Sequence, residues 1–343
     1  MSNARKLAAN LPTDGQLGNR NLIINGAMKV AQRGTSSTTT NGFGTVDRFR
    51  IWHGAVGNVA TNQYNSGSNA VDGISNYSFR AQATNTASLA AGSDAHIRYV
   101  VEDKDIQNIG LTNPNNNFTL SFYVKCSNAG QSSVGLASGN FSSATYVVPF
   151  TIASADTWQR VELTFPGNAA LSNVSSGFGL RIYWDLGIGT NYQTSTHNQW
   201  ITSGNPFAAA GNLQIIGVYD RWLQITGVQL EVGSEVTPFE HEPYTVTLAK
   251  CQRYYYRMDG NKTTWMYPIN TNNANGYRRG SIHFPVTMRT TPTATAGIVH
   301  SGGTSGVDGG VWIGPDCVGV YVNGINGETD YAYVNALEVD AEL

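Results

Sequence analysis

The segment RWLQITGVQLEVGSEVTPFEHEPYTVTLAKCQRYYYR, residues 221–257, decides the fold because it passes from a strand pattern into a helical one. Trp222–Val232 is rich in strand-forming residues and closes on Gly233. Pro238 and Pro243 exclude regular strand pairing or helix across the connection. After Pro243, apolar residues recur at i, i+4, i+7 and i+11, which predicts an α-helix. This stripe consists of Tyr244, Leu248, Cys251 and Tyr255.

Three consecutive tyrosines end the predicted helix. Tyr254, Tyr255 and Tyr256 would point about 100° apart around a helix of 3.6 residues per turn. One apolar surface cannot cover all three, and a second copy of the chain would supply the missing neighbours. We therefore expect these tyrosines to form contacts between copies of the chain.

The residues before this segment alternate between apolar and polar side chains. Phe118, Leu120, Phe122 and Val124, for example, are separated by polar residues and Tyr123, as in a half-buried strand. Many such strands without a helical period predict a mainly β fold, a two-sheet antiparallel jelly-roll sandwich. The predicted organisation is an N-terminal arm (1–20), the sandwich (21–242), the connecting helix (243–260) and a smaller C-terminal β domain (261–343).

Composition and cysteine spacing limit the class of protein. Of the 343 residues 41% are hydrophobic and 13% charged, and the formal net charge of −2 gives no attraction to nucleic acid. Cys126, Cys251 and Cys317 have no metal-ligand spacing, and the first two are expected to be buried thiols. No apolar run is long enough for membrane insertion, and nothing resembles a signal peptide, so we expect synthesis in a reducing cytoplasm.

Charge is divided within the C-terminal β domain. Lys250 to Arg289 carries seven basic residues and one acid, whereas the residues after Arg289 carry seven acids and no Lys or Arg. We expect the two halves to pair by charge, within one chain or between chains. An acidic site for a cation or ligand is the alternative.

The sequence contains no motif that indicates catalysis. The six histidines are scattered, and neither a GxSxG elbow nor a Walker A sequence is present. The acidic run Glu102–Asp105 lacks the glycine and final glutamate of a calcium-binding EF-hand loop, which favours a solvated turn. We therefore predict no catalytic residue, no cofactor and no metal.

Several segments resemble one family, the bacteriophage tail-fibre and related virion adhesin proteins. They are ITGVQLEVGSEVTPFEHEPYTVTLAKCQRYYYR (225–257), NLIINGAMKVAQRGTS (21–36), VDRF (46–49), FPVTMRTTPT (284–293) and VDAEL (339–343). The resemblance implies a sandwich like a carbohydrate-binding module, joined by the helix to a β-rich tip. It further implies a virion protein, made in the host cytoplasm, that forms homotrimers.

The resemblance also bears on the termini and on activity. The opening SNARKLA is similar to leader peptides of other virion proteins, so Arg5, Lys6, Leu7 and Leu11 are expected to attach the chain to another virion protein. A flexible leader without a role is the alternative. Polysaccharide-cleaving tailspikes are usually long parallel β-helices, and this chain has no 20–50-residue repeat. We therefore expect binding rather than enzymatic activity.

Glycan binding needs exposed rings for the C–H faces of sugars and amides for their hydroxyls. Tyr183–Trp200 contains this mixture, and Tyr192, Asn198 and Trp200 are its candidates, with core or subunit contacts equally open for the two rings. Trp158, Trp184 and Trp222 lie in strands and are expected in the core. Further candidates in the C-terminal domain are Trp265, Tyr267, Tyr277, Arg278 and Trp312.

The expected function is therefore adhesion to a host-surface polysaccharide or lipopolysaccharide, without covalent chemistry. The alternative is a capsid decoration, head fibre or other structural appendage without a dominant receptor-binding role.

Overall fold

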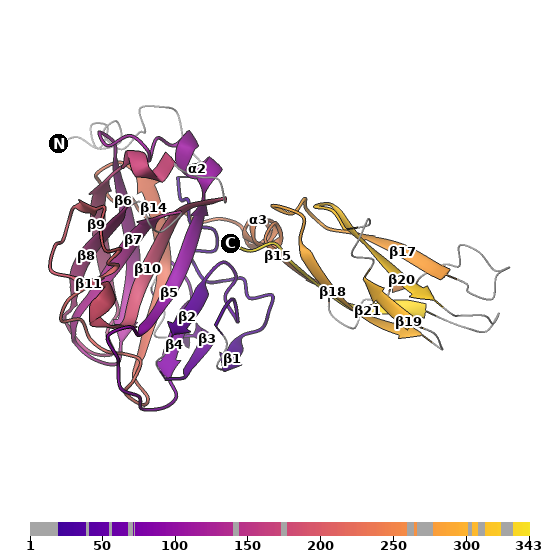
Figure 1. Ribbon diagram of the computed structural model, residues 1–343, viewed down its shortest axis with the longest axis horizontal. Coiled ribbons are helices and arrows are strands. Elements are labelled where there is room, and N and C mark those ends of the chain that lie inside the picture. The colour runs from indigo at the N-terminus through magenta and orange to yellow at the C-terminus, as the bar shows by residue number, and fades with distance from the viewer. Residues whose placement is uncertain are drawn as a thin grey trace. The chain divides into compact units, whose positions relative to one another are not determined.

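Figure 1 shows the computed structural model, in which the chain divides between Glu242 and Pro243 into two compact units. We call them the sandwich unit, up to Glu242, and the C-terminal unit, from Pro243. The structure describes residues 20–38, 41–54, 57–67, 71, 73–139, 144–172, 177–258, 264–265, 277–300, 304–307, 313–323 and 332–343. The predicted attachment residues Arg5, Lys6, Leu7 and Leu11 lie outside these ranges.

The sandwich unit consists of two six-stranded antiparallel sheets. The first sheet contains, in spatial order, β1 (Ser36–Thr38), β3 (Val59–Asn65), β4 (Tyr77–Ala83), β14 (Trp222–Val232), β6 (Asn117–Cys126) and β9 (Gln159–Pro166). The second sheet contains β12 (Trp200–Ile201), β8 (Thr145–Ile152), β7 (Gly130–Ser138), β10 (Phe178–Ile188), β5 (Asp94–Glu102) and β2 (Arg50–Gly54). The predicted β-sandwich is thus confirmed.

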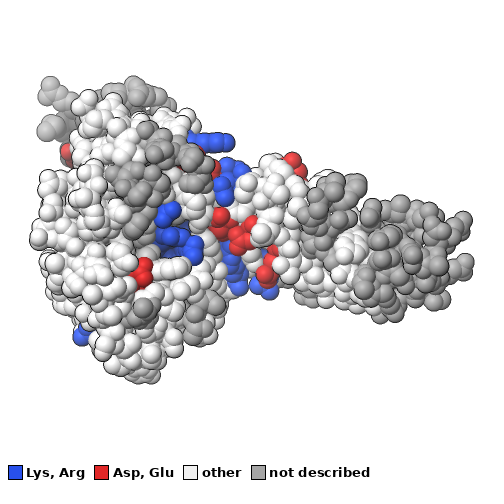
Figure 2. All heavy atoms as spheres, viewed as in Figure 1, with Lys and Arg blue, Asp and Glu red and all other residues white. Residues whose placement is uncertain are grey.

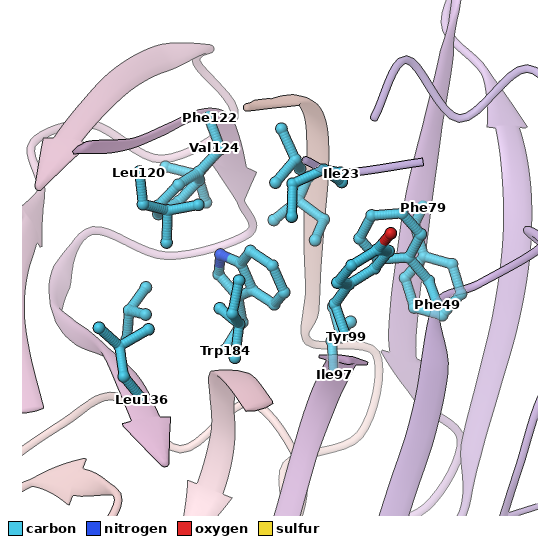
Figure 3. Close-up of a cluster of buried hydrophobic side chains, with 14 of the residues drawn as sticks. Ile23, Phe49, Phe79, Ile97, Tyr99, Leu120, Phe122, Val124, Leu136 and Trp184 are labelled. Carbon is cyan, nitrogen blue, oxygen red and sulfur yellow. The ribbon is translucent and has the colours of Figure 1, made fainter. Parts of the chain in front are cut away.

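Alternating side chains place the core between the two sheets. In edge strand β9, Val161, Leu163 and Phe165 are buried while the residues between them are exposed. Trp184 of β10 is 1% exposed and meets the ring of Phe122 edge-on at 5.8 Å between centroids. Figure 3 shows its indole among the labelled side chains of both sheets. Trp184 is therefore a core residue, as predicted.

Two polar segments of the sandwich unit form regular secondary structure, and one of them is the acidic run expected to be a solvated turn. The stretch 57–73 contains β3, whose Val59 and Thr61 turn into the core and are each 2% exposed. The acidic turn begins a short helix, α2 (Asp103–Asn108), because Ile106 is completely buried and anchors it. In both places tertiary packing outweighs a polar local composition.

Shorter elements complete the sandwich unit. They are the 3-10 turns η2 (Ala169–Ser172) and η3 (Thr190–Tyr192) and a small parallel pair, β11 (Gln193–Thr194) with β13 (Ala208–Ala209).

The C-terminal unit begins with the helix α3 (Tyr244–Gln252), which is shorter than predicted. Its end is followed by β15 (Tyr255–Met258), in which Tyr255 pairs with Asp340 and Tyr256 with Val339. The inference that the three tyrosines surround a helix is therefore wrong. The helix ends at Gln252, and the chain then pairs as a strand with β21 (Ala332–Asp340). The first member of the stripe, Tyr244, is 53% exposed. A contact between copies through Tyr254, Tyr255 and Tyr256 stays a prediction.

Two further small sheets form the rest of this unit. The first joins β15, β21 (Ala332–Asp340), β16 (Thr264–Trp265) and β18 (Thr293–His300). The second joins β17 (Tyr277–His283), β20 (Cys317–Asn323) and β19 (Thr304–Val307).

Charge pairing within the C-terminal unit follows the division seen in the sequence. Arg257 of β15 lies directly opposite Glu338 of β21, with 3.6 Å between Nε and Oε1. The guanidinium of Arg289 donates to the carbonyl oxygen of Ala341 at 2.9 Å. Both contacts join the basic part to the acidic part, and the ion pair between Arg257 and Glu338 is charge pairing within one chain, one of the two arrangements expected.

The cysteine prediction is confirmed at both positions: Cys126 and Cys251 are completely buried thiols. In the part of the chain that the structure describes, no helix is long and apolar enough to cross a membrane. Within the same part, no group of three or more His, Cys, Asp or Glu side chains is placed to hold a metal ion.

Candidate functional site

Three neighbouring strands of the second sheet, β10, β5 and β2, each present an arginine on the outer face of the sandwich. Because side chains alternate along a strand, burial of Ile51, Ile97 and Ile182 in the core sends their neighbours outwards. The outward neighbours are Arg50, Arg98 and Arg181, which we call the arginine row. Figure 2 shows a group of Lys and Arg side chains on the surface, at the place where Figure 1 shows strands β5 and β2.

The register makes this row unfavourable by itself. Arg50 pairs directly with Arg98, and Arg181 pairs with Val100, one outward position along β5 from Arg98. Side chains directly opposite each other have Cβ atoms about 5 Å apart, and like charges there destabilise a sheet. Local rules are most often broken at functional sites. The arginine row is therefore a candidate for a binding role.

Tyr183 contacts two members of the arginine row. It lies on β10 directly opposite Arg98, and its hydroxyl hydrogen-bonds the guanidinium groups of Arg98 and Arg181. Burial raises the pKa of Tyr183, while the two arginines lower it. Burial also lowers the pKa of Arg98 to about 10, with the charges of Arg50 and Arg181 acting in the same direction and Tyr183 in the opposite one. Arg98 therefore remains charged at neutral pH.

Aromatic rings flank the row. The guanidinium of Arg50 lies 5.5 Å from the ring of Trp52 and 5.8 Å from that of Phe43. Arg181 lies 4.8 Å from the ring of Phe178. All three rings are partly exposed. Such contacts restrain the guanidinium planes and leave apolar surface beside them, a combination suited to a ring-shaped polar ligand.

A segment of the chain covers another part of this outer face. We call residues 205–213 the covering segment. Phe207 stacks over Tyr183 with 5.1 Å between centroids and meets His96 edge-on at 5.5 Å. Gly135 of β7 allows this approach, since a Cβ there would lie 2.1 Å from the carbonyl oxygen of Phe207. The arginine row thus occupies the part of the face beside this segment.

Two buried polar side chains lie directly opposite each other on the outer side of β5 and β10, His96 and Asp185. Asp185 accepts hydrogen bonds from the backbone N–H of Gly187 at 2.7 Å and from the amide of Asn212 at 2.5 Å. Burial raises the pKa of Asp185 to about 7, although these two hydrogen bonds lower it. Burial, followed by the charges of the arginine row, holds the pKa of His96 well below its usual value.

An acid with a pKa near neutrality is a candidate for proton transfer. Asp185, however, is 3% exposed, and both of its oxygens already accept hydrogen bonds from the protein. His96 is likewise 3% exposed, with Tyr183 and Phe207 against its ring. A substrate cannot reach either side chain without displacing the protein around it, so we assign this pair a structural role.

The glycan candidates in the sandwich unit have different surroundings. Tyr192 is partly exposed and stacks on Phe207 at 5.4 Å, at the margin of the covering segment. Asn198 has an exposed side chain and a backbone N–H bonded to the carbonyl oxygen of Val147. Trp200 packs on Tyr146 at 5.2 Å and donates its indole N–H to the carbonyl oxygen of Pro166. These contacts favour the core alternative for Trp200.

Two other tryptophans expected in the core are instead partly exposed. Trp222 lies under the guanidinium of Arg80, which is 4.6 Å from its ring. It occupies the outward phase of β14, because Leu223 and Ile225 take the inward positions. Trp158 immediately precedes β9 and is partly exposed as well. The prediction of core positions for these two residues is wrong.

The candidates in the C-terminal unit stay predictions. Trp265 lies on β16, and Tyr277 and Arg278 lie on β17, but only the backbone of these three residues is described. Tyr267 and Trp312 lie outside the described residues.

Reasoning from the sequence missed the arginine row, because its members come from three strands that are far apart along the chain. The available signal was weak: each arginine is a long cation at a polar position of an otherwise apolar or aromatic strand. Only the register brings these positions together.

No protein-family model matches this chain, and no curated protein matches it. Solved structures with similar folds include the enzymatically active domain of tailspike protein 4 from bacteriophage CBA120, with a TM-score of 0.33 and 11% identity. That alignment covers 62% of this chain, which spans only 21% of the tailspike chain. The xylan-binding domain CBM22-1 of Paenibacillus barcinonensis Xyn10C is matched over 60% of this chain and 100% of its own, with a TM-score of 0.29 and 12% identity.

A third similar structure is TmCBM61 in complex with β-1,4-galactotriose, with a TM-score of 0.29 and 12% identity over 63% of this chain and 100% of that one. These TM-scores are too low to carry an argument about function. The case for the site therefore rests on its own side chains.

Proposed function

We propose that this chain is a virion adhesin whose sandwich unit binds a host-surface glycan, without covalent chemistry, on the outer face of the second sheet. The observation that carries the proposal is the arginine row, restrained by Tyr183 and flanked by the partly exposed rings of Phe43, Trp52 and Phe178. Guanidinium groups donate hydrogen bonds to sugar oxygens, and the rings offer surface to sugar C–H groups. The virion context rests on the resemblance of the sequence segments quoted above.

Association into a homotrimer, and attachment of residues 1–20 to another virion protein, complete the proposal. Single-site affinity for a glycan at such an open face is expected to be weak. Several copies on one particle raise the effective concentration of sites, so that weak contacts suffice for adhesion.

The glycan-binding part can be tested with a glycan array and the purified full chain. Trp52→Ala removes one flanking ring, and Trp222→Ala is its matched control, because Trp222 also is partly exposed beneath an arginine but lies on the first sheet. We expect Trp52→Ala to weaken binding at least about fivefold, since an aromatic contact contributes about 1 kcal/mol. Trp222→Ala should bind like the wild type. Equal losses in both variants would contradict the proposed location.

The virion part has a separate test. Gold-labelled antibodies against residues 261–343, viewed on intact particles, should label the periphery of the tail. Label over the capsid would instead favour a decorating protein or head fibre, with glycan binding reduced to an accessory role.

A further inference from the structure

The charge of the arginine row indicates which glycans the proposed face would select, an inference that rests on the proposed function. Arg98 stands at its centre, directly opposite Arg50 on one side and Tyr183 on the other. Within the described part of the chain, the central cation of the row thus has two arginines and a tyrosine, and no carboxylate, among the groups that shift its pKa.

Two basic side chains on the other side of the sandwich have different surroundings. On the outer face of the first sheet, Lys125 contacts Asp156 at 2.9 Å and Arg160 contacts Glu162 at 3.3 Å. Each of these cations has an acid within a few ångströms, as is usual for a protein surface. Arg98, whose charged neighbours in the described part of the chain are arginines, therefore differs from Lys125 and Arg160 in the sign of its neighbours.

An oxyanion would turn this unfavourable arrangement into a favourable one. A guanidinium presents several N–H donors in a fixed fork that matches a carboxylate, sulfate or phosphate, and such charge-assisted bonds are about twice as strong as neutral ones. Tyr183 restrains Arg98 from one side, and the rings of Trp52 and Phe43 restrain Arg50. Donors fixed in advance lose little conformational freedom when they bind.

We propose that the outer face of the second sheet recognises an acidic saccharide, and that Arg98, with Arg50 beside it, binds the oxyanion carried on the sugar ring. Trp52, Phe43 and Phe178 contact the apolar parts of the same or adjacent rings. Carboxylate, sulfate and phosphate share this chemistry, so the experiment distinguishes them. A nucleic acid is a poorer fit, because the chain carries a net charge of −2 and Lys125 and Arg160 of the opposite face are paired with acids.

The test uses the full chain on an array in which each acidic oligosaccharide stands beside a neutral counterpart: uronic and sialic acids beside their methyl esters, and sulfated or phosphorylated sugars beside the unmodified sugars. Oligo-dT is the nucleic-acid probe. We expect the wild type to bind at least one acidic member at least tenfold more tightly than its neutral counterpart. Arg98→Gln should remove this preference. Arg98→Lys should restore part of it, because lysine keeps the charge but not the fork.

Arg160→Gln is the matched control, since it removes the same charge from the opposite face of the sandwich, and it should leave the preference unchanged. Melting curves of all variants establish that they are folded. Binding of acidic saccharides and oligo-dT with equal strength, lost equally in Arg160→Gln, would show non-specific attraction of polyanions and overturn the inference.

The two proposals fail in different ways. Glycan binding that depends on Trp52 but is indifferent to Arg98 and to the acidic group overturns the acidic specificity and leaves the proposed function intact. Absence of binding to every saccharide on the array overturns both.

Discussion

Arg98 shows how one residue can oppose the stability of the sheet that contains it. Arg50 lies directly opposite it, and Arg181 lies one outward position further along β5. Repulsion between like charges on neighbouring strands costs a fraction of a kcal/mol to about 1 kcal/mol and is screened by salt. Arg98 is therefore better explained by the proposed binding of an oxyanion than by a contribution to the stability of the sheet.

This explanation predicts a salt-dependent difference in stability. Relative to the wild type, Arg98→Gln should be most stable in dilute buffer, where repulsion within the arginine row is strongest. Raising NaCl to about 0.3 M shortens the screening length to several ångströms and should narrow the difference between the two melting temperatures. Thermal unfolding of both proteins across a salt series measures it. A difference that does not change with salt would contradict the electrostatic explanation.

The raised pKa of Asp185 predicts that the stability of the sandwich unit depends on pH. The pKa of Asp185 in the folded state, about 7, lies above its ordinary value of 3.8. Between these values the folded chain keeps a proton that the unfolded chain has lost, so the contribution of Asp185 to stability falls as pH rises from about 4 to 7. Burial lowers the pKa of His96, so below its ordinary value of 6.5 the unfolded chain binds a proton that the folded chain does not. The contribution of His96 to stability therefore rises with pH in that range.

Because these two effects offset each other in the wild type, a variant is needed to separate them. Asp185→Asn stays uncharged, so its stability relative to the wild type should increase as pH rises from 4 to 7 and then level off. Chemical denaturation at a series of pH values measures this difference. Asp156→Asn, at the surface contact with Lys125, is the control and should not reproduce the trend.

Some residue roles could be predicted from the sequence, and others depended on information that a sequence lacks. Trp184 was predictable as a core residue because it shares the apolar phase of β10 with Leu180 and Ile182. Trp222 was assigned by its membership of a strand, whereas its phase along β14 points it outwards. The arginine row required the pairing of three strands, which single-strand periodicity cannot supply.

Among the structural elements, the covering segment depends most clearly on one residue of the sheet beneath it. Its backbone approaches β7 so closely that Gly135 has no room for a Cβ beneath the carbonyl oxygen of Phe207. Ala209 and Asn212 also bind the hydroxyl oxygen of Ser133 on the same strand, at 3.1 and 2.7 Å. A single methyl group at residue 135 must therefore displace the segment or strain the strand.

Gly135→Ala is accordingly expected to destabilise the sandwich unit by about 1–3 kcal/mol, the usual cost of overpacking. It should also increase amide hydrogen exchange in residues 205–213. Gly92→Ala is the control, because the nearest atom to its added Cβ lies at 3.8 Å. Unchanged stability and exchange in Gly135→Ala would show that the covering segment is not packed as described.

The elements that the sequence predicted correctly are those whose local pattern agrees with their tertiary environment. The strands of the sandwich alternate because each has one face in the core. In the C-terminal unit the helix begins at Tyr244, directly after Pro243 as predicted, but ends before the tyrosines, where Tyr255 and Tyr256 pair with β21. No local feature of YYYR (residues 254–257) indicates that it pairs with β21, because β21 lies near the end of the sequence.

The chain consists of two compact units with separate hydrophobic clusters. One cluster is formed by the two large sheets, and the other by side chains of the C-terminal unit such as Val320, Val334 and Leu337. A core of this kind is what an independently folding domain requires. The proposed binding face lies entirely on the sandwich unit.

A chain containing only residues 1–242 should therefore unfold cooperatively and keep the affinity of the full chain for a single glycan site. It should adhere less strongly to cells if association into trimers depends on the remaining residues. Calorimetry and monovalent binding assays measure the first two properties. An insoluble fragment would contradict independent folding of the sandwich unit. A folded fragment without glycan affinity would place part of the site outside this unit.

A crystal structure of the full chain with its tightest-binding saccharide would show whether the outer face of the second sheet binds the ligand. We expect saccharide density over Arg50, Arg98 and Arg181, with a sugar ring against Trp52 or Phe178. Density over the first sheet beside Trp222, or on the C-terminal unit near Trp265, with an empty arginine row, would contradict this expectation.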